Sequence, residues 1–328
     1  MISSSTGFKT SSFFKKSLEK VSRLVYHISM DKNGKQNLQT ITAEDGGFAF
    51  SFSVISILLI SIIYSTVLSV IAGKNTSVFS SDAVIILNYV LSPIAILLAI
   101  GILRYKNKKN YIALATSKKF ELKPLIATLF IGFGLTFGLS EINTLFVTFL
   151  QGLGLKITAP SLPGYSPINV VLVILSVCIL PSIFEEFLFR GIILSSLKKT
   201  GVVFATLISG ALFSLFHMSP AQTVYQFIVG LIYSLIIVCG GNLLYTIIIH
   251  FINNLYIVLN YYYFNVTVDL GLTILGLISL ALGIVILVYK RRQIPLDKAE
   301  KKQNRINFLL GVIMGAIASL FMWIQGLI

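Results

Sequence analysis

The chain has 328 residues, of which 55% are hydrophobic and only 12% are charged. Soluble domains carry about 25% charged residues, so this composition excludes an ordinary soluble protein. A net charge of +14 on a soluble surface would suggest nucleic acid as a partner. Here the basic residues lie in loops between apolar runs close to 20 residues long, so we expect no nucleic-acid partner. The pattern predicts an all-α, polytopic bundle of transmembrane helices in a lipid bilayer.

Residues 1–47 are polar and basic. Four apolar residues recur there at helical spacing beside lysines: Phe14, Leu18, Val21 and Val25. This segment is therefore either an interfacial amphipathic helix or an unstructured cytoplasmic tail. No cleavable signal peptide is expected, because the first long apolar run begins at Phe48.

The apolar runs predict nine spans, and eight would also fit the pattern. Their expected positions are 48–72, 83–103, 124–150, 168–189, 201–217, 221–239, 242–264, 270–289 and 307–327. We divide the chain into the tail (1–47), N-terminal spans (48–164), a central core (165–264) and C-terminal spans (265–328). Gly134 with Gly138, and Gly311 with Gly315, are small-residue pairs typical of close helix packing.

The basic residues predict the orientation of the chain. All 26 Lys and Arg except Lys74, Lys156 and Arg190 lie in alternate loops, on what should be one side of the membrane. By the positive-inside rule, this asymmetry places the N-terminus in the cytoplasm. We expect a multi-pass protein of the cell membrane. Its two cysteines, Cys178 and Cys239, lie in apolar segments and are expected to be small buried residues.

A run of charged residues interrupts the fourth span, in Pro181-Ser182-Ile183-Phe184-Glu185-Glu186-Phe187-Leu188-Phe189-Arg190. Each charge at bilayer depth costs about 2.5–3.5 kcal/mol, so such residues are functional or paired. On a helix, Glu186 and Arg190 are four residues apart and can form an ion pair. Glu185 points about 100° away from Glu186, which leaves it free for chemistry. Glu141, in the third span, is expected to form a helix–helix hydrogen bond or to lie at the edge of the site.

Two of the three histidines lie in predicted spans. His217 ends the fifth, and His250 lies in the seventh, four residues before Asn254 and so on the same helix face. If the fourth and fifth spans form a hairpin near Gly201, Glu185 and His217 lie at matching depth.

This set of residues allows two kinds of chemistry. A buried glutamate beside a histidine can deprotonate water, while a second histidine and an amide can donate hydrogen bonds to an oxyanion. The same carboxylates and histidines could instead bind a zinc ion.

Three motifs in this order carry a family resemblance: Glu-Glu-x-x-x-Arg (Glu185 to Arg190), Phe-x-x-x-His (Phe213 to His217) and His-x-x-x-Asn (His250 to Asn254). They resemble the signature of the CPBP family of intramembrane CAAX-processing and bacteriocin-processing endopeptidases, also called Abi or CAAX protease self-immunity proteins. The resemblance covers roughly residues 165–260 and implies an endopeptidase.

The resemblance also implies a role for each motif residue. Glu185 and His217 would activate the attacking water, His250 and Asn254 would hold the oxyanion, and Glu186 with Arg190 would brace the site. The family has also been described as metal-dependent. Because the sequence has no His-Glu-x-x-His helix, we favour a metal-free mechanism. If a divalent metal such as zinc is present, its ligands would be Glu185, His217 and His250.

The substrate expected from this resemblance is a membrane-associated peptide or protein. The abundance of Lys, Asn and Ile hints at a bacterium, where relatives serve peptide or bacteriocin processing and self-immunity. One alternative is a non-catalytic immunity or scaffold protein with the same fold. Another is a proton-coupled transporter, which should show a repeat that this sequence lacks.

Overall fold

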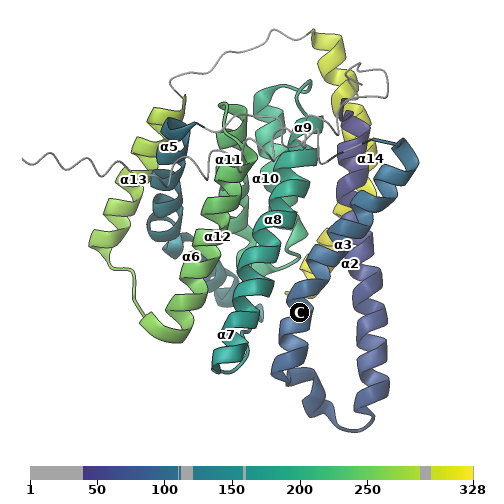
Figure 1. The fold of residues 1–328 in the computed structure, drawn as a ribbon, viewed down its shortest axis with the longest axis vertical. Helices are drawn as coiled ribbons and strands as arrows, with labels where there is room; N and C mark the ends of the chain where they lie inside the picture. Colours follow the sequence, from purple (N-terminus) through teal and green to yellow (C-terminus); the bar gives the residue numbers. More distant parts are fainter. Residues whose placement is uncertain (1–39, 110, 112–120, 158–159, 289–296, 328) are drawn as a thin grey trace, which may run out of the picture.

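The computed structural model describes residues 40–109, 111, 121–157, 160–288 and 297–327, and within these residues it is helical without strands. Figure 1 labels its α-helices, which are α2 (Ala43–Ala72), α3 (Asp82–Asn107), α5 (Leu122–Phe133), α6 (Ser140–Gly152), α7 (Pro167–Val173), α8 (Leu180–Glu186), α9 (Leu194–Ser196), α10 (Val202–Phe216), α11 (Thr223–Val238), α12 (Leu243–Leu259), α13 (Leu270–Val288) and α14 (Lys298–Gln325). The predicted tail helix and residues 289–296 lie outside the described residues.

Eight helical segments in the described part of the chain are long and apolar enough to cross a membrane: 43–72, 82–107, 122–152, 167–196, 220–238, 243–264, 270–287 and 298–325. The predicted span 201–217 corresponds to α10, which has only 15 residues and would extend about 22 Å. That length is short of a hydrocarbon core of about 30 Å. The multi-pass helical bundle is therefore confirmed, with eight candidate spans among the described residues.

The first span begins earlier than its apolar run, at Ala43 rather than Phe48. Thr42 and Asp45 form a capping box, in which each side chain accepts a hydrogen bond from the other residue's backbone N–H. Asp45 is buried, and its carboxylate lies 2.6 Å from the Lys109 ammonium. The cap and the ion pair let this helix start within a polar stretch.

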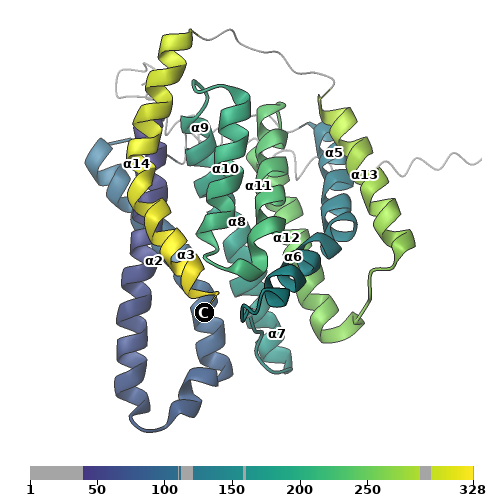
Figure 2. The ribbon, with the colours of Figure 1, turned by 180° about the vertical axis from the view of Figure 1, so that it is seen from behind.

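The helices form a central group and two flanking groups, as the two opposite views in Figures 1 and 2 show. The centre holds α8, α10, α11 and α12. On one side lie α2, α3 and α14, and on the other lie α5 and α13. The helices before residue 167 and those after residue 264 therefore flank a central group built from residues 167–264.

Glycines allow the flanking helices to approach one another closely. Gly315 of α14 packs on Ser51 of α2, where an added Cβ would lie 2.6 Å from the Ser51 Cα. The Ser51 hydroxyl also donates to the Gly311 carbonyl at 2.7 Å. Gly134 and Gly138 make the equivalent contact with α13, since an added Cβ on Gly138 would lie 2.8 Å from the Leu277 nitrogen. Both predicted small-residue pairs are confirmed as close helix contacts.

We expect Gly315→Val to destabilise the α2–α14 contact by about 1–3 kcal/mol, since the new side chain overlaps backbone. The thermal midpoint of the purified protein in detergent micelles measures this loss. Gly101→Val is the matched control, because an added Cβ there meets nothing within 4 Å. Equal midpoints for the two variants would contradict the contact.

The fourth span is one continuous helix with two π-helical turns. They cover Ile174–Ile179 and Phe187–Ile193, and α8 lies between them. Pro181 at the start of α8 has no N–H with which to donate to the Val177 carbonyl four residues earlier. A π turn inserts one extra residue and rotates the rest of the helix about its axis, and such turns are frequent at functional sites. The helix is therefore irregular on both sides of Glu185 and Glu186.

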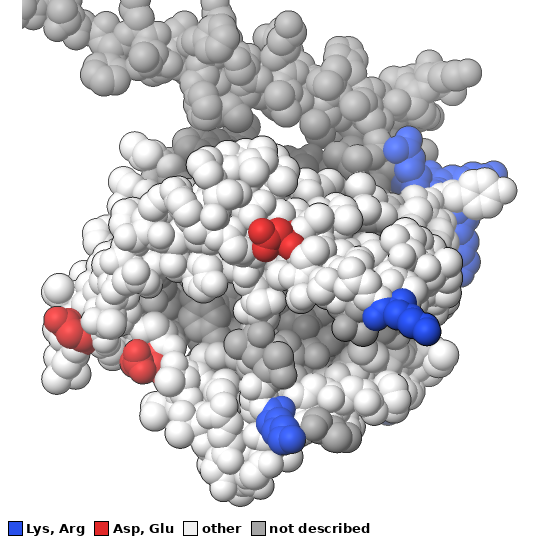
Figure 3. Space-filling view, turned by 90° about the horizontal axis from the view of Figure 1, so that it is seen from below, with Lys and Arg blue, Asp and Glu red and all other residues white. Residues whose placement is uncertain are grey.

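The described basic residues gather at one end of the bundle. They lie at the end of α3, at the start of α5 and α14, and after α9: Arg104, Lys106, Lys108, Lys109, Lys123, Lys198, Lys199, Lys298, Lys301, Lys302 and Arg305. Figure 3 views the opposite face, where charged side chains are scattered, and the described basic ones in its loops are Lys74 and Lys156. His217 lies at the end of α10 that points toward this weakly charged face.

We expect the basic end to face the cytoplasm. In a background without the native cysteines, Lys74→Cys should react with a membrane-impermeant maleimide on intact cells. Lys298→Cys should react only after the cells are permeabilised. The reverse labelling pattern would mean that the N-terminus is outside.

The expectation for Glu141 is wrong. It lies in the first turn of α6, after a π-helical turn at Gly134–Gly138, and its side chain is exposed. An exposed carboxylate takes part in neither a buried helix–helix hydrogen bond nor the buried site.

Candidate functional site

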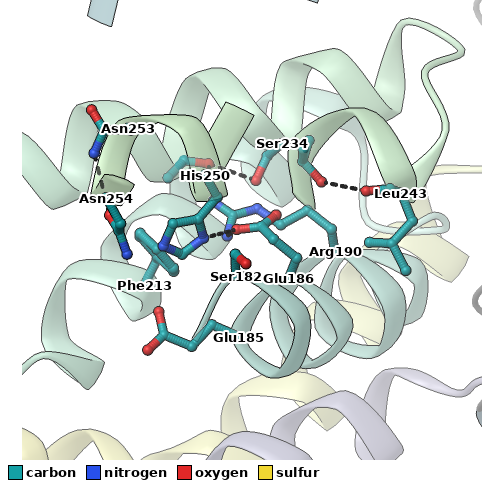
Figure 4. Close-up of polar contacts among 12 residues, drawn as sticks. Ser182, Glu185, Glu186, Arg190, Phe213, Ser234, Leu243, His250, Asn253 and Asn254 are labelled. Carbon is teal, nitrogen blue, oxygen red and sulfur yellow. Dashed lines mark hydrogen bonds and ion pairs between the residues drawn. The ribbon is translucent and has the colours of Figure 1, made fainter. Parts of the chain in front are cut away.

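The two adjacent glutamates of α8 are both buried but lie in different environments. Glu186 has no exposed area, and Glu185 retains 7%. Figure 4 shows their carboxylates pointing in different directions, as expected for neighbouring positions on a helix. Each acid therefore has its own set of partners.

Glu186 joins Arg190 and His250 in one buried group. Its Oε1 accepts a hydrogen bond from the Arg190 Nη1 at 2.8 Å and lies 3.0 Å from the His250 Nδ1. The predicted Glu186–Arg190 ion pair is thus present, but its link to His250 was not foreseen. Arg190 also donates to the Gly230 carbonyl of α11 at 3.3 Å. This group connects α8, α11 and α12 and fixes the His250 ring.

Aromatic rings surround the Arg190 guanidinium. Its central carbon lies 4.3 Å from the centre of the Phe213 ring and 5.1 Å from that of Tyr233. A cation over an aromatic face is attracted by the ring quadrupole, most strongly away from water. Phe213 also contacts His250 and His217, with ring centres 6.1 and 5.0 Å apart. The Phe of the second motif therefore separates the two histidines and holds both.

Glu185 faces His217, and the two side chains leave a gap. The Glu185 Oε2 lies 3.9 Å from the His217 Nε2, too far for a direct hydrogen bond. Among the described residues, this buried oxygen has no hydrogen-bond partner. The His217 Nδ1 lies 2.8 Å from the Phe213 carbonyl, to which it can only donate. In neutral His217 the lone pair is then on Nε2, so both atoms facing the gap accept hydrogen bonds. A water molecule can donate to both.

Asn254 is held by the irregular part of the fourth span. Its Nδ2 donates to the Val177 carbonyl at 2.9 Å, the carbonyl to which Pro181 cannot donate. Its Oδ1 lies 3.4 Å from the Asn253 Nδ2. Because a carbonyl only accepts, the first contact fixes which end of the Asn254 amide is the nitrogen. The second N–H of that amide remains for a ligand.

The residues that support Asn254 were not predicted from the sequence. The Asn253 Oδ1 accepts from the Tyr225 hydroxyl at 2.8 Å and from the Thr136 hydroxyl at 3.1 Å. Asn143 of α6 bonds the Ala221 carbonyl and, at 3.5 Å, the Tyr225 nitrogen. The sequence signal that could have found all of them is a polar residue within an apolar span. Such a residue costs free energy in the membrane unless it is hydrogen-bonded.

The structure thus places the predicted residues in two connected groups. Glu185 and His217 face each other, and Glu186, Arg190 and His250 form the buried cluster. The side chains of Glu185 and His217 keep 9% and 16% exposure, whereas those of Glu186 and Arg190 have none. Glu185 and His217 can therefore meet a reactant, as can His250, whose side chain keeps 8% exposure, whereas Glu186 and Arg190 cannot.

The residues do not fit a three-ligand metal site. Within the part of the chain that the structure describes, no group of three or more His, Cys, Asp or Glu side chains is placed to hold a metal ion. The conditional set Glu185, His217 and His250 is not brought together as such a group. We derive no step through a metal.

Residues 167–256 match a family model described as type II CAAX prenyl endopeptidase Rce1-like, in agreement with the CPBP resemblance. The match covers the helices that carry all three motifs and extends neither to α2 and α3 nor to α13 and α14. No curated protein and no solved structure gives a significant match to the chain.

Proposed function

We propose that the chain is an intramembrane endopeptidase in which Glu185 and His217 activate water to cleave a membrane-associated peptide or protein. Similarity to Rce1-like endopeptidases implies a protease of the CAAX type. The observation that carries the residue assignment is the gap between Glu185 Oε2 and His217 Nε2. A water molecule donating to both acceptors has its oxygen lone pairs directed away from them, toward a substrate carbonyl.

The reaction would then run with Glu185 as the base. The carboxylate takes a proton from the water as the water oxygen attacks the carbonyl carbon of the scissile peptide. His217 holds the water through Nε2. When the tetrahedral intermediate collapses, the C–N bond breaks and Glu185 returns the proton to the leaving amine. No atom of the enzyme is consumed.

His250 and Asn254 would stabilise the oxyanion of that intermediate. Asn254 offers the N–H that the Val177 carbonyl does not use. His250 can donate from Nε2 to the oxyanion and from Nδ1 to Glu186 only as an imidazolium. The Glu186 Oε1, 3.0 Å from the His250 Nδ1, fixes the ring that would make this contact, so Glu186 would do more than brace the site.

For the substrate, we propose a peptide held in the bilayer of the cell membrane. Peptide or bacteriocin maturation and self-immunity are the roles that fit the CPBP resemblance. A site buried between membrane-spanning helices meets a chain in or on the bilayer more readily than a soluble protein.

The test is cleavage by wild-type protein reconstituted in lipid vesicles with an amphipathic candidate peptide, read by mass spectrometry of the products. The inactive reference is Glu185→Gln. We expect cleavage that survives a zinc chelator. Cleavage that the chelator abolishes and zinc restores would replace the metal-free mechanism. An immunity phenotype in cells that Glu185→Gln retains in full would favour the non-catalytic scaffold.

A further inference from the structure

His217 lies in the turn between α10 and α11, and this turn contains little regular secondary structure. His217 follows the last residue of α10, and Met218 has a φ of +48°. That left-handed conformation is uncommon for a residue other than glycine. Only a three-residue 3₁₀ turn, Pro220–Gln222, precedes α11. The position of the His217 ring therefore depends on what fixes this turn.

Two hydrogen bonds within the turn converge on Thr223. The Ser214 hydroxyl donates to the Thr223 carbonyl at 2.8 Å, which ties the last turn of α10 to the start of α11. The Thr223 hydroxyl donates to the Ser219 carbonyl at 3.1 Å, which closes the turn. Because the His217 Nδ1 is bonded to the Phe213 carbonyl, the ring moves with this end of α10.

The last turn of α14 contacts this turn from outside. The indole Nε1–H of Trp323 donates to the Thr223 hydroxyl at 2.7 Å. One helical turn later, Gly326 packs on Pro220, where an added Cβ would lie 2.8 Å from the proline Cδ. The Thr223 oxygen thus accepts from the indole while it donates to Ser219, and hydrogen bonds in such a chain polarise and strengthen one another.

We propose that Trp323 is a positioning residue for the proposed reaction, acting on His217 through Thr223. The proposal rests on the proposed function and assigns a part in it to α14, a helix outside the matched residues 167–256. The indole holds the turn so that the His217 Nε2 stays across the gap from Glu185. A shift of this ring changes where water is held, and small misplacements of reacting groups slow catalysis strongly.

Ordinary helix packing is the competing explanation, and the kinetic parameters separate the two. Loss of packing alone lowers the amount of folded enzyme. A displaced His217 lowers kcat in the folded enzyme and leaves KM unchanged, because His217 holds the water rather than the peptide.

The experiment compares wild type, Trp323→Phe, Thr223→Val, the double variant and Glu185→Gln, reconstituted with a peptide that the wild type cleaves. Phenylalanine keeps the ring packing and removes the indole N–H. We expect Trp323→Phe to lower kcat about fivefold, the effect of one hydrogen bond, at unchanged KM. The double variant should be no slower than Thr223→Val, because both remove the same contact. Phe321→Leu, an outward-facing change on the same helix, should behave as wild type.

Hydrogen exchange adds a measurement that needs no activity. Backbone amides of residues 217–219, 221 and 222 should exchange faster in Trp323→Phe than in wild type or Phe321→Leu. If Trp323→Phe does not fold, Thr223→Val tests the same bond from its other end.

A wild-type kcat and unchanged exchange in Trp323→Phe, with Glu185→Gln inactive, would overturn the positioning role alone. Additive losses in the double variant would overturn the route through Thr223. If Glu185→Gln cleaves as fast as wild type, the proposed function fails, and the exchange comparison still decides whether Trp323 holds the turn.

Discussion

Glu185→Gln is expected to lower kcat for peptide cleavage by about 10²–10⁴-fold, the contribution of a positioned general base. Glutamine has nearly the same size as glutamate but cannot take a proton from water. Since the Glu185 Oε2 has no hydrogen-bond partner among the described residues, the substitution disturbs little beyond the approach of this oxygen to His217. The folded state and KM should therefore change little. Product formation at saturating peptide, measured by mass spectrometry, gives the ratio.

The matched control is Glu141→Gln, because Glu141 is an exposed carboxylate outside the site. It should cleave at the wild-type rate. A thermal midpoint clearly lower in Glu185→Gln than in wild type would instead show that Glu185 has a structural role. A folded variant with undiminished kcat would remove Glu185 from the mechanism and leave Glu186 or a different site to be considered.

The sequence predicts the parts of this fold that depend on local pattern. Long apolar runs give the spans, because a helix must hide its backbone from lipid. Small residues four apart, such as Gly311 and Gly315, predict close helix contacts, and both predicted pairs make them. The spacing of Glu186 and Arg190 predicts their ion pair, which is present at 2.8 Å. Each of these depends on positions within one helix.

Other features depend on contacts between helices and could not be read from spacing. The regular α-helix gives way to π-helical turns on both sides of α8 and to a break before α6. We attribute these irregularities to the packing of each helix on its neighbours. Because of that break, Glu141 is exposed. Likewise, α10 has a continuous apolar run but ends after 15 residues at Phe216, just before His217.

The partners of the candidate site show the same limit. The spacing of His250 and Asn254 says that they share a face, but not that His250 turns to Glu186 and Asn254 to the Val177 carbonyl. Tyr225, Asn253 and Trp323 belong to none of the three motifs. Their contacts follow only from which helices meet, so motif matching finds the residues that we propose to react and misses those that orient them.

Arg190→Met is expected to lower the free energy of unfolding by about 3–5 kcal/mol, because it leaves a buried carboxylate without its cation. Both side chains of the Glu186–Arg190 pair have no exposed area, so water cannot take the place of the guanidinium. The change also removes the hydrogen bond to Gly230 and the stacking on Phe213. The thermal midpoint and denaturant unfolding of the purified protein in micelles measure the loss.

Two further variants show whether the cost comes from charge. Lys199→Met breaks the exposed Lys199–Glu300 pair, whose side chains are 63% and 42% exposed, and should cost about 1 kcal/mol or less. Glu186→Gln combined with Arg190→Met removes both buried charges and keeps a polar partner for His250. We expect the double variant to recover part of the stability that Arg190→Met loses, since replacing a whole buried pair is much less costly than breaking it. A double variant less stable than Arg190→Met would instead assign the loss of stability to packing around the guanidinium. The position of the His250 ring would then depend on packing more than on charge.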